Sequence, residues 1–343
     1  MTSRKDQVKL IFIIFLIMVF ISFIVFLQMM DFTPDNDITA TGNTAGNLYN
    51  GGYFCEYNDD IYFSWPADDH AIYCMKKDGS LSKTRVTDAF SINIYNNYLY
   101  YGRNAAKGKT RSFLDGRPFG VYRVSLKSGR SKSLCNSLSA YICLCGNNLF
   151  LQEYTDTSLY FSRVDVKDSK DFERISSIGY PISCADNGYL YYAELEENHN
   201  IYRYDSRTGA TELFYEGSCY QPIYENGFLY FIDLADGYAL KRYNVSSQEI
   251  TVITNDRCIN YNVSDSVILY QIENPDTNHY ALYRNNTAGT EEELVAKESC
   301  NHINIAGDYA YFQYFTNKYA FYRVNLLGPL QVEEFKPDIM NIK

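Results

Sequence analysis

Bulky and polar residues alternate along most of this chain in one recurring frame. In the clearest copy, a bulky residue, a tyrosine and an aromatic residue open a strand at 190–192, and a second strand follows a polar loop at 201–204. The polar segment 205–209 ends in the glycine that a tight turn between antiparallel strands favours. Flanking strands at 180–185 and 210–214 complete the unit, so the pattern predicts four short antiparallel strands.

The same frame occurs seven times between residues 50 and 337. Its middle position is aromatic in every copy, and successive copies lie 38 to 50 residues apart. These landmark residues are Tyr62, Tyr100, Phe150, Tyr191, Tyr230, Tyr270 and Tyr311. A period of about 40 residues with four short strands per copy is typical of a β-propeller, in which repeated sheets pack radially. We therefore predict an all-β fold, a propeller of seven four-stranded blades, with six blades as the alternative.

An apolar run that no charged residue interrupts begins at residue 10 and continues for 18 positions. This length approaches what a helix needs to cross a bilayer. The basic residues before the run are Arg4, Lys5 and Lys9. Because acidic residues follow it, the pattern predicts a single-pass transmembrane helix over 10–30, with residues 1–9 in the cytoplasm and the propeller outside it. We expect an uncleaved signal anchor, since the run is longer than the core of a cleaved signal peptide, the alternative, and no small-x-small cleavage motif follows.

The segment between the apolar run and the first repeat is polar. Residues 31–49 are rich in Thr, Asn, Gly and Asp and have neither a strand nor a helix period, which predicts a flexible tether. The predicted propeller then occupies 50–337, and a short tail follows at 338–343. An alternative for the tether is that residues 38–41 pair with the last blade and close the ring.

The net charge of the chain is −10 at neutral pH. Nucleic acid is therefore an unfavourable partner, because its phosphates attract basic proteins. An acidic domain is also repelled by anionic lipid headgroups. This charge favours a domain held away from the membrane surface over one that lies on it.

The nine cysteines follow the repeat instead of suggesting a pairing scheme. Cys55, Cys143 and Cys184 each precede the landmark aromatic by seven residues, and a second column holds Cys219, Cys258 and Cys300. Both columns fall on the predicted innermost strand, where cysteine serves as a small apolar filler. We predict structural thiols, and disulfides between adjacent blades, such as Cys258 with Cys300, remain the alternative.

The repeated strands resemble those of a known family. The strand with a bulky residue, Tyr and an aromatic, the Leu/Ile-Tyr-Arg strand with its Asp-Gly-type turn, and the entry sequence GNTAGNLYNGG at 42–52 are the motifs concerned. Together they look like bacterial domains of unknown function that resemble the low-density-lipoprotein-receptor-related YWTD β-propeller, over about 42–337. The YWTD tetrapeptide itself is absent, so no receptor residues can be assigned. The resemblance implies an extracytoplasmic, often membrane-anchored propeller with no assigned reaction.

Reactive residues do not form a predicted catalytic constellation. His70, His199 and His279 fall in equivalent loops of different blades, and His302 falls on an inner strand as an interior histidine. The arginine repeated in the third strand of the units is interpreted as a structural salt bridge or carbonyl contact at the rim, with substrate binding as the alternative. No nucleophile elbow, phosphate-binding loop or zinc-spacing pair occurs. The sequence thus predicts no catalytic activity, no metal site and no cofactor.

One loop differs from its counterparts in length and charge. An insertion at 103–119 follows the second strand of the second unit and carries Arg103, Lys107, Lys109, Arg111 and Arg117. The equivalent loops of other units are acidic, and the residues that we assign to a ligand-binding face with the insertion are Glu194, Glu196, Asp233 and Asp236. We expect the basic loop to act as a flap among these acidic neighbours.

The function that these features favour is a non-catalytic binding module at the bacterial cell envelope. Its partner would be an unknown protein, a peptide or a cell-envelope polymer. One alternative is an extracellular sensor subunit of a membrane signalling complex. Another is a glycosidase or lyase that uses paired carboxylates such as Glu196 and Asp233.

Overall fold

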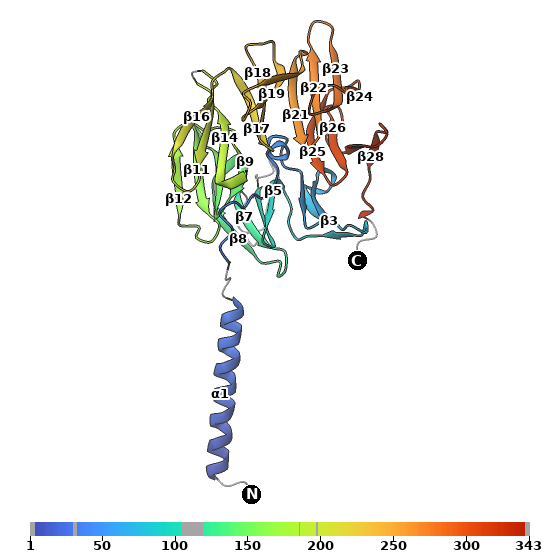
Figure 1. Cartoon of the computed structure of the whole chain (residues 1–343). Coiled ribbons are helices and arrows are strands. Elements are labelled where there is room, and N and C mark those ends of the chain that lie inside the picture. The colour runs from blue at the N-terminus through green and yellow to red at the C-terminus, as the bar shows by residue number, and fades with distance from the viewer. Residues whose placement is uncertain (1–3, 30–32, 104–118, 185, 197, 340–343) are drawn as a thin grey trace. The chain divides into compact units, whose positions relative to one another are not determined.

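The computed structural model describes residues 4–29, 33–103, 119–184, 186–196 and 198–339 (Figure 1). The chain divides into two compact units, Met1–Asp35 and Asn36–Lys343. The first unit contains helix α1 (Arg4–Met29), and the second contains every strand of the described chain together with the short helix α2 (Ala45–Tyr49). Among the described residues, the single-turn 3-10 helices η1 (Pro66–Asp68) and η3 (Asp186–Gly188) lie in loops.

Helix α1 exposes the apolar side chains of its central part. The large apolar residues between Ile11 and Ile24 are 38% to 67% exposed. Within the part of the chain that is described, no helix combines the length and the apolarity that crossing a membrane requires. The transmembrane helix predicted over 10–30 is therefore not supported.

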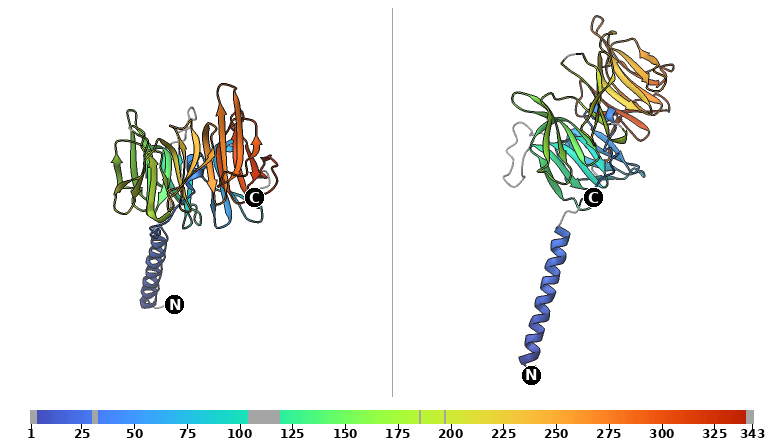
Figure 2. Two further views of the ribbon diagram at one scale, coloured as in Figure 1. Left: turned by 45° about the horizontal axis from the view of Figure 1, so that its top comes forward. Right: turned by 60° about the vertical axis from the view of Figure 1, so that its left-hand side comes forward.

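The second unit consists of seven four-stranded antiparallel sheets, each built from four strands consecutive in the sequence. The sheets are arranged radially as blades (Figure 2), and the strands of each blade are named A to D from the channel outward. In blades 1 to 4 they are β1 (Phe54–Tyr57), β2 (Asp60–Trp65), β3 (Ala71–Met75), β4 (Leu81–Lys83); β5 (Ala89–Tyr95), β6 (Tyr98–Arg103), β7 (Gly120–Ser125), β8 (Ser131–Cys135); β9 (Leu138–Cys145), β10 (Asn148–Tyr154), β11 (Leu159–Asp165), β12 (Phe172–Ser176); β13 (Ser183–Cys184), β14 (Tyr189–Ala193), β15 (Ile201–Asp205) and β16 (Thr211–Tyr215). In blades 5 to 7 they are β17 (Cys219–Glu225), β18 (Phe228–Asp233), β19 (Ala239–Asn244), β20 (Ile250–Thr254); β21 (Cys258–Ser264), β22 (Val267–Asn274), β23 (His279–Asn286), β24 (Glu293–Ala296); β25 (Cys300–Ala306), β26 (Tyr309–Tyr314), β27 (Phe321–Asn325) and β28 (Glu333–Phe335).

The prediction of seven four-stranded blades is confirmed, and the six-bladed alternative is wrong. The channel has two ends. At the turn end lie the A–B turns, and at the loop end lie the B–C loops and the connections from strand D to the next strand A. All landmark aromatics lie on strand B, where they alternate with residues that pack on the opposite face of the blade.

An aromatic cluster between the last and first blades closes the ring. Phe54 of β1 stacks on Tyr311 of β26 with ring centroids 4.0 Å apart, and Phe335 of β28 contacts Phe63 of β2 edge to face at 5.2 Å. Burying each such side chain stabilises the fold by roughly 2 kcal/mol. Because each blade supplies its own four strands, packing closes the ring without a strand shared between the chain ends.

The predicted tether over 31–49 is wrong from residue 36 onward. These residues belong to the propeller unit, and Ala40, Asn47 and Leu48 are almost fully buried. The alternative of a closing strand is also wrong, because Thr41 forms an isolated bridge with Cys145 of blade 3. Polar composition misled the prediction, since the asparagines in this segment bond to buried main-chain groups.

The cysteines of the described chain match the structural prediction. Cys55, Cys74, Cys135, Cys143, Cys219, Cys258 and Cys300 are free, and all of these except the partly buried Cys135 are buried. Cys55 and Cys143 lie within inner strands, and Cys219, Cys258 and Cys300 each open one. Burial raises the pKa of the Cys55 thiol to about 12, which leaves it protonated and unreactive at neutral pH.

Candidate functional site

The central channel is filled by the segment that enters the ring before the first strand. Helix α2, the short blue helix within the ring in Figure 1, is buried over its whole length and contacts the inner strands β9, β13, β17, β21 and β25. Thr44 caps it, because its hydroxyl accepts a hydrogen bond from the Asn47 main-chain N–H at 3.2 Å. We call residues 42–52 the plug.

Asparagine side chains attach the plug to the edges of the inner strands. Asn47 forms a pair of hydrogen bonds with Ile305, whose N–H donates to Oδ1 at 2.6 Å and whose carbonyl accepts from Nδ2 at 2.8 Å. Asn43 Nδ2 donates to the carbonyls of Phe54 and Ile92, in blades 1 and 2, at 2.8 and 2.7 Å. The plug thus satisfies main-chain groups that would otherwise be buried without partners.

A cavity of about 570 Å³ lies at the turn end of the channel, between the plug and the A–B turns. Its walls include the carboxylates of Glu56, Glu225 and Asp265. Glu56 accepts a hydrogen bond from the Gly307 N–H at 2.8 Å, and Glu225 accepts one from the Asp265 N–H at 2.8 Å. Each bond joins neighbouring blades, so the main chain of one blade fixes a carboxylate of the next.

Three tyrosines complete the walls of this cavity. Tyr57, Tyr95 and Tyr224 come from blades 1, 2 and 5. Among the described residues that line the cavity, none is Lys, Arg or His. Carboxylates and aromatic rings without a basic neighbour form an environment that favours a cationic group.

His70 and His302 form a pair at the loop end. The sequence did not predict this pair. The Tyr53 ring lies 5.8 Å from the ring of His70 in blade 1 and 4.8 Å from that of His302 in blade 7, between centroids. Burial lowers the pKa of both imidazoles, although Asp88 and Asp69 oppose this effect at His70. Both rings are therefore neutral near pH 7. Equivalent loops are spread around the ring, but ring closure brings the inner strand of blade 7 beside the first blade.

The contacts of this histidine pair do not form a nucleophilic triad. Ser64 Oγ lies 3.3 Å from His70 Nδ1, but the hydroxyl is fully buried and donates to the Ala89 carbonyl at 2.8 Å. His302 Nδ1 lies 3.3 Å from the carbonyl of Asn50, at the end of the plug. Within the described residues, no three His, Cys, Asp or Glu side chains are grouped so that they could hold a metal ion.

The basic residues of the predicted flap fall mostly outside the described residues. Those outside are Lys107, Lys109, Arg111 and Arg117. Arg103, at the end of β6, forms an ion pair with Asp88 at 3.5 Å. This pair holds the start of the insertion against the loop that leads into strand A of the same blade.

Three of the four predicted acidic ligands stabilise their own loops. Glu194 accepts hydrogen bonds from the N–H groups of Glu196 and Asn198 at 2.6 and 3.1 Å. Lys241 Nζ bridges Asp233 and Asp236 at 2.8 and 2.6 Å.

The fourth predicted acid, Glu196, is exposed, as Asp236 is. Glu196 lines a recess of about 550 Å³ between blades 3 and 4, together with Thr155 and Leu195. The Glu196 carboxylate is thus accessible at the surface of this recess.

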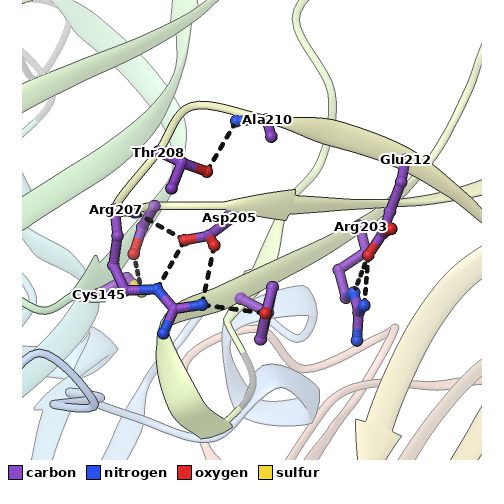
Figure 3. Close-up of polar contacts among 9 residues, drawn as sticks. Cys145, Arg203, Asp205, Arg207, Thr208, Ala210 and Glu212 are labelled. Carbon is purple, nitrogen blue, oxygen red and sulfur yellow. Dashed lines mark hydrogen bonds and ion pairs between the residues drawn. The ribbon is translucent and has the colours of Figure 1, made fainter.

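In blades 3, 4, 6 and 7 the arginine of strand C forms a structural ion pair, and in blade 2 Arg123 donates to the Val166 carbonyl at 2.7 Å. Arg163, Arg284 and Arg323 bond to Glu173, Glu293 and Glu333 of the adjacent strand D at 2.7, 2.9 and 2.7 Å. Figure 3 shows the same arrangement in blade 4, where Arg203 pairs with Glu212. In that view Arg207 also binds Asp205 through two nitrogens at 2.8 Å, which lowers the pKa of the Asp205 carboxyl to about 2.

No protein-family model matches this chain, and no curated protein matches it in sequence. The predicted resemblance to YWTD-like propellers therefore has no support beyond the propeller fold itself. Similar solved structures include a prolyl endopeptidase (TM-score 0.60, 9% identity, covering 85% of this chain and 51% of that one). A puromycin-hydrolyzing peptidase of Mycobacterium tuberculosis (0.57, 10%, 90% and 56%) and oligopeptidase B of Leishmania major (0.55, 10%, 88% and 49%) are also similar. The chain spans about half the length of these proteins, and at such identities the likeness shows the fold alone.

Proposed function

We propose that this chain is a non-catalytic binding module that captures a positively charged segment of a protein, peptide or envelope polymer in the turn-end cavity. The observation that carries the proposal is the lining of that cavity, with Glu56, Glu225 and Asp265 beside three tyrosines and no basic residue among its described walls. A cation over a tyrosine ring gains roughly 0.5–2 kcal/mol, and a nearby carboxylate adds electrostatic attraction. The net charge of −10 steers cationic partners toward the chain.

Binding is favoured over catalysis by how the carboxylates are held. Glu56 and Glu225 accept hydrogen bonds from main-chain N–H groups of neighbouring blades, which hold both carboxylates in place. A carboxylate that is held in place is a good acceptor for an ammonium or guanidinium group. Because these carboxylate side chains are already held in place, binding costs little conformational entropy.

We place the module at the cell membrane, with the N-terminus cytoplasmic and the propeller outside. The support is the set of exposed apolar side chains of α1 between Ile11 and Ile24, since a helix that is apolar on all sides needs a non-aqueous environment. Arg4, Lys5 and Lys9 precede these side chains and favour a cytoplasmic N-terminus. Alkaline carbonate extraction of membranes and protease treatment of intact cells test the location. Release of the chain by carbonate, or protection of residues 36–343 in intact cells, would contradict it.

The binding experiment measures fluorescence anisotropy of a labelled lysine decamer with the full chain in phosphatidylcholine nanodiscs, whose headgroups carry no net charge. The triple variant Glu56→Gln, Glu225→Gln, Asp265→Asn removes three charges but keeps hydrogen-bond acceptors. We expect at least about tenfold weaker binding, which corresponds to roughly 1.4 kcal/mol. Asp276→Asn, an exposed acid of the β22–β23 loop, serves as the matched control and should leave binding unchanged. Equal affinity of the triple variant and the wild type would remove the cavity from the proposal.

A sensor function is the second candidate, because Thr41 to Asn47 form part of the cavity wall. A ligand there would touch the segment that continues along the chain into the N-terminal unit. Crosslinking between copies through a cysteine placed in α1, measured with and without the lysine decamer, tests this. A crosslinking yield that does not respond to the decamer would rule out the sensor function.

A further inference from the structure

Several buried polar atoms without hydrogen-bond partners lie in the loop-end halves of inner strands. Among the described residues they include Ser139 Oγ, Gln221 Oε1, Asn260 Oδ1 and Asn301 Oδ1. All four residues lie in the first half of an inner strand, which is the half nearest the loop end. An unsatisfied buried polar group costs roughly 1–3 kcal/mol, so such a concentration calls for a partner that the chain does not supply.

Bulges interrupt inner strands near this end. Strands β17 and β25 shift register between Tyr220 and Ile223 and between Asn301 and Asn304. Their bulge residues, Gln221 and His302, have φ of 49° and 52°, a left-handed conformation that is unfavourable for residues other than glycine. His302 contacts Tyr53 and the end of the plug. Gln221 occupies the equivalent position in blade 5 and is 9% exposed.

Aromatic rings surround the same place. Tyr49, at the end of α2, contacts Tyr141 of blade 3 edge to face at 5.9 Å and donates a hydrogen bond to the Pro181 carbonyl at 3.3 Å. Tyr220 of blade 5 lies near enough to Tyr141 to raise its pKa, although burial is the larger cause. Tyr53, Tyr141 and Tyr220 are each partly exposed.

Asn50 connects these groups from the floor of the loop end. Its Oδ1 accepts hydrogen bonds from Asn260 Nδ2 at 2.6 Å and from the Ile303 N–H at 2.8 Å, and its own Nδ2 donates to the Tyr261 carbonyl at 2.9 Å. Asn260 therefore has its nitrogen occupied, which leaves its oxygen without a donor. Blades 1, 3, 5, 6 and 7 all contribute a group to this set.

We propose that the loop end binds a neutral, hydroxyl-rich ligand of the saccharide class. Hydroxyl groups are the donors that the amide oxygens of Gln221, Asn260 and Asn301 lack, and the apolar C–H faces of a sugar ring pack on tyrosine rings. The neutral imidazoles of His70 and His302 can each donate or accept a hydrogen bond. None of the residues in this set carries a charge at neutral pH, which distinguishes it from the turn-end cavity. The inference is independent of the proposed function, since it uses the opposite end of the channel.

The test measures binding of chitotriose, cellotriose and maltotriose to the full chain by saturation-transfer NMR and titration calorimetry. The chain is kept in a detergent without a sugar headgroup. We expect at least one of the three to bind. Gln221→Met should weaken it about tenfold or more while leaving the thermal midpoint equal or higher, because the substitution removes an unpartnered polar atom. His302→Gln, which keeps one donor and one acceptor, should weaken binding less.

Two results would overturn the saccharide proposal. The first is that none of the three sugars binds to the wild type. The second is that Gln221→Met lowers the thermal midpoint without changing affinity, because the side chain would then be structural. The turn-end triple variant is the matched control and should bind the sugar as well as the wild type does, so the two proposals fail or succeed separately.

Discussion

The two ends of the channel are built from opposite halves of the same inner strands, yet their chemistry differs. At the turn end, Glu56 and Glu225 receive main-chain N–H groups from the neighbouring blade, so their carboxylates are held in place. At the loop end, Gln221 and Asn301 carry buried oxygens that no donor reaches. The bulges account for the difference, because they break the ladder only in the first half of the strand. One repeated strand can therefore supply both a satisfied, charged surface and an unsatisfied, neutral one.

The largest effect should come from Gly46→Ala, which disturbs both ends at once. A Cβ at Gly46 would overlap Asn262 Oδ1, so either the plug or the inner strand of blade 6 must move. We expect a loss of about 3 kcal/mol in the free energy of unfolding, as for other overpacked cores, measured by urea denaturation. Ala288→Val, in an exposed turn of blade 6, adds carbon atoms at the surface and should change stability little. A stable Gly46→Ala variant with both ligands still bound would show that the ends do not depend on the plug.

A smaller, pH-dependent effect should be confined to the loop end. Burial lowers the pKa of His70 and His302, so the folded protein keeps them neutral while the unfolded chain takes up protons below its pKa of about 6.5. Stability contributed by this pair therefore falls as pH decreases from 7 toward 5. The double variant His70→Gln, His302→Gln should lose less stability over that interval than the wild type, as measured by denaturation at both pH values. His279→Gln, at an exposed site, is the control; an identical pH dependence in the double variant would contradict the assignment.

The smallest effect on stability should follow from replacing residues 104–118 with a short Gly-Ser turn, which keeps Arg103 and its ion pair with Asp88. We expect the thermal midpoint to stay within a few degrees, because surface loops contribute little to a repeat core. Envelope proteins recovered by pull-down should decrease or change if the basic loop contributes to recognition. An unchanged set would separate the loop from binding, and a collapse in stability would make it structural.

The propeller fold could be predicted from the sequence because the packing of the blades imposes a repeat of aromatic residues. The aromatic frame around Tyr191 and Tyr311 repeats since both faces of each blade must be buried, and the arginine of strand C repeats with it. The plug could not be predicted, because Asn43 and Asn47 bond to main-chain groups. Such bonds do not depend on the side chain of the partner residue, so the sequence pattern does not show them.

The candidate site was harder to predict for a related reason. His70 and His302 lie in the first and last blades, and only closure of the ring brings them together. The bulge that places Gln221 depends on local register, and no composition signal marks it.

The plug also has a consequence for how the chain is made. Asn47 and Asn50 leave the ribosome before the first blade, but their partners Ile305 and Ile303 lie in blade 7, 258 and 253 residues further along the chain. The plug therefore remains polar and solvated while the blades are synthesised. It can be enclosed only after blade 7 has emerged. Contacts between such distant residues slow folding. The asparagine-rich composition that made this segment look like a tether also keeps it soluble during that interval.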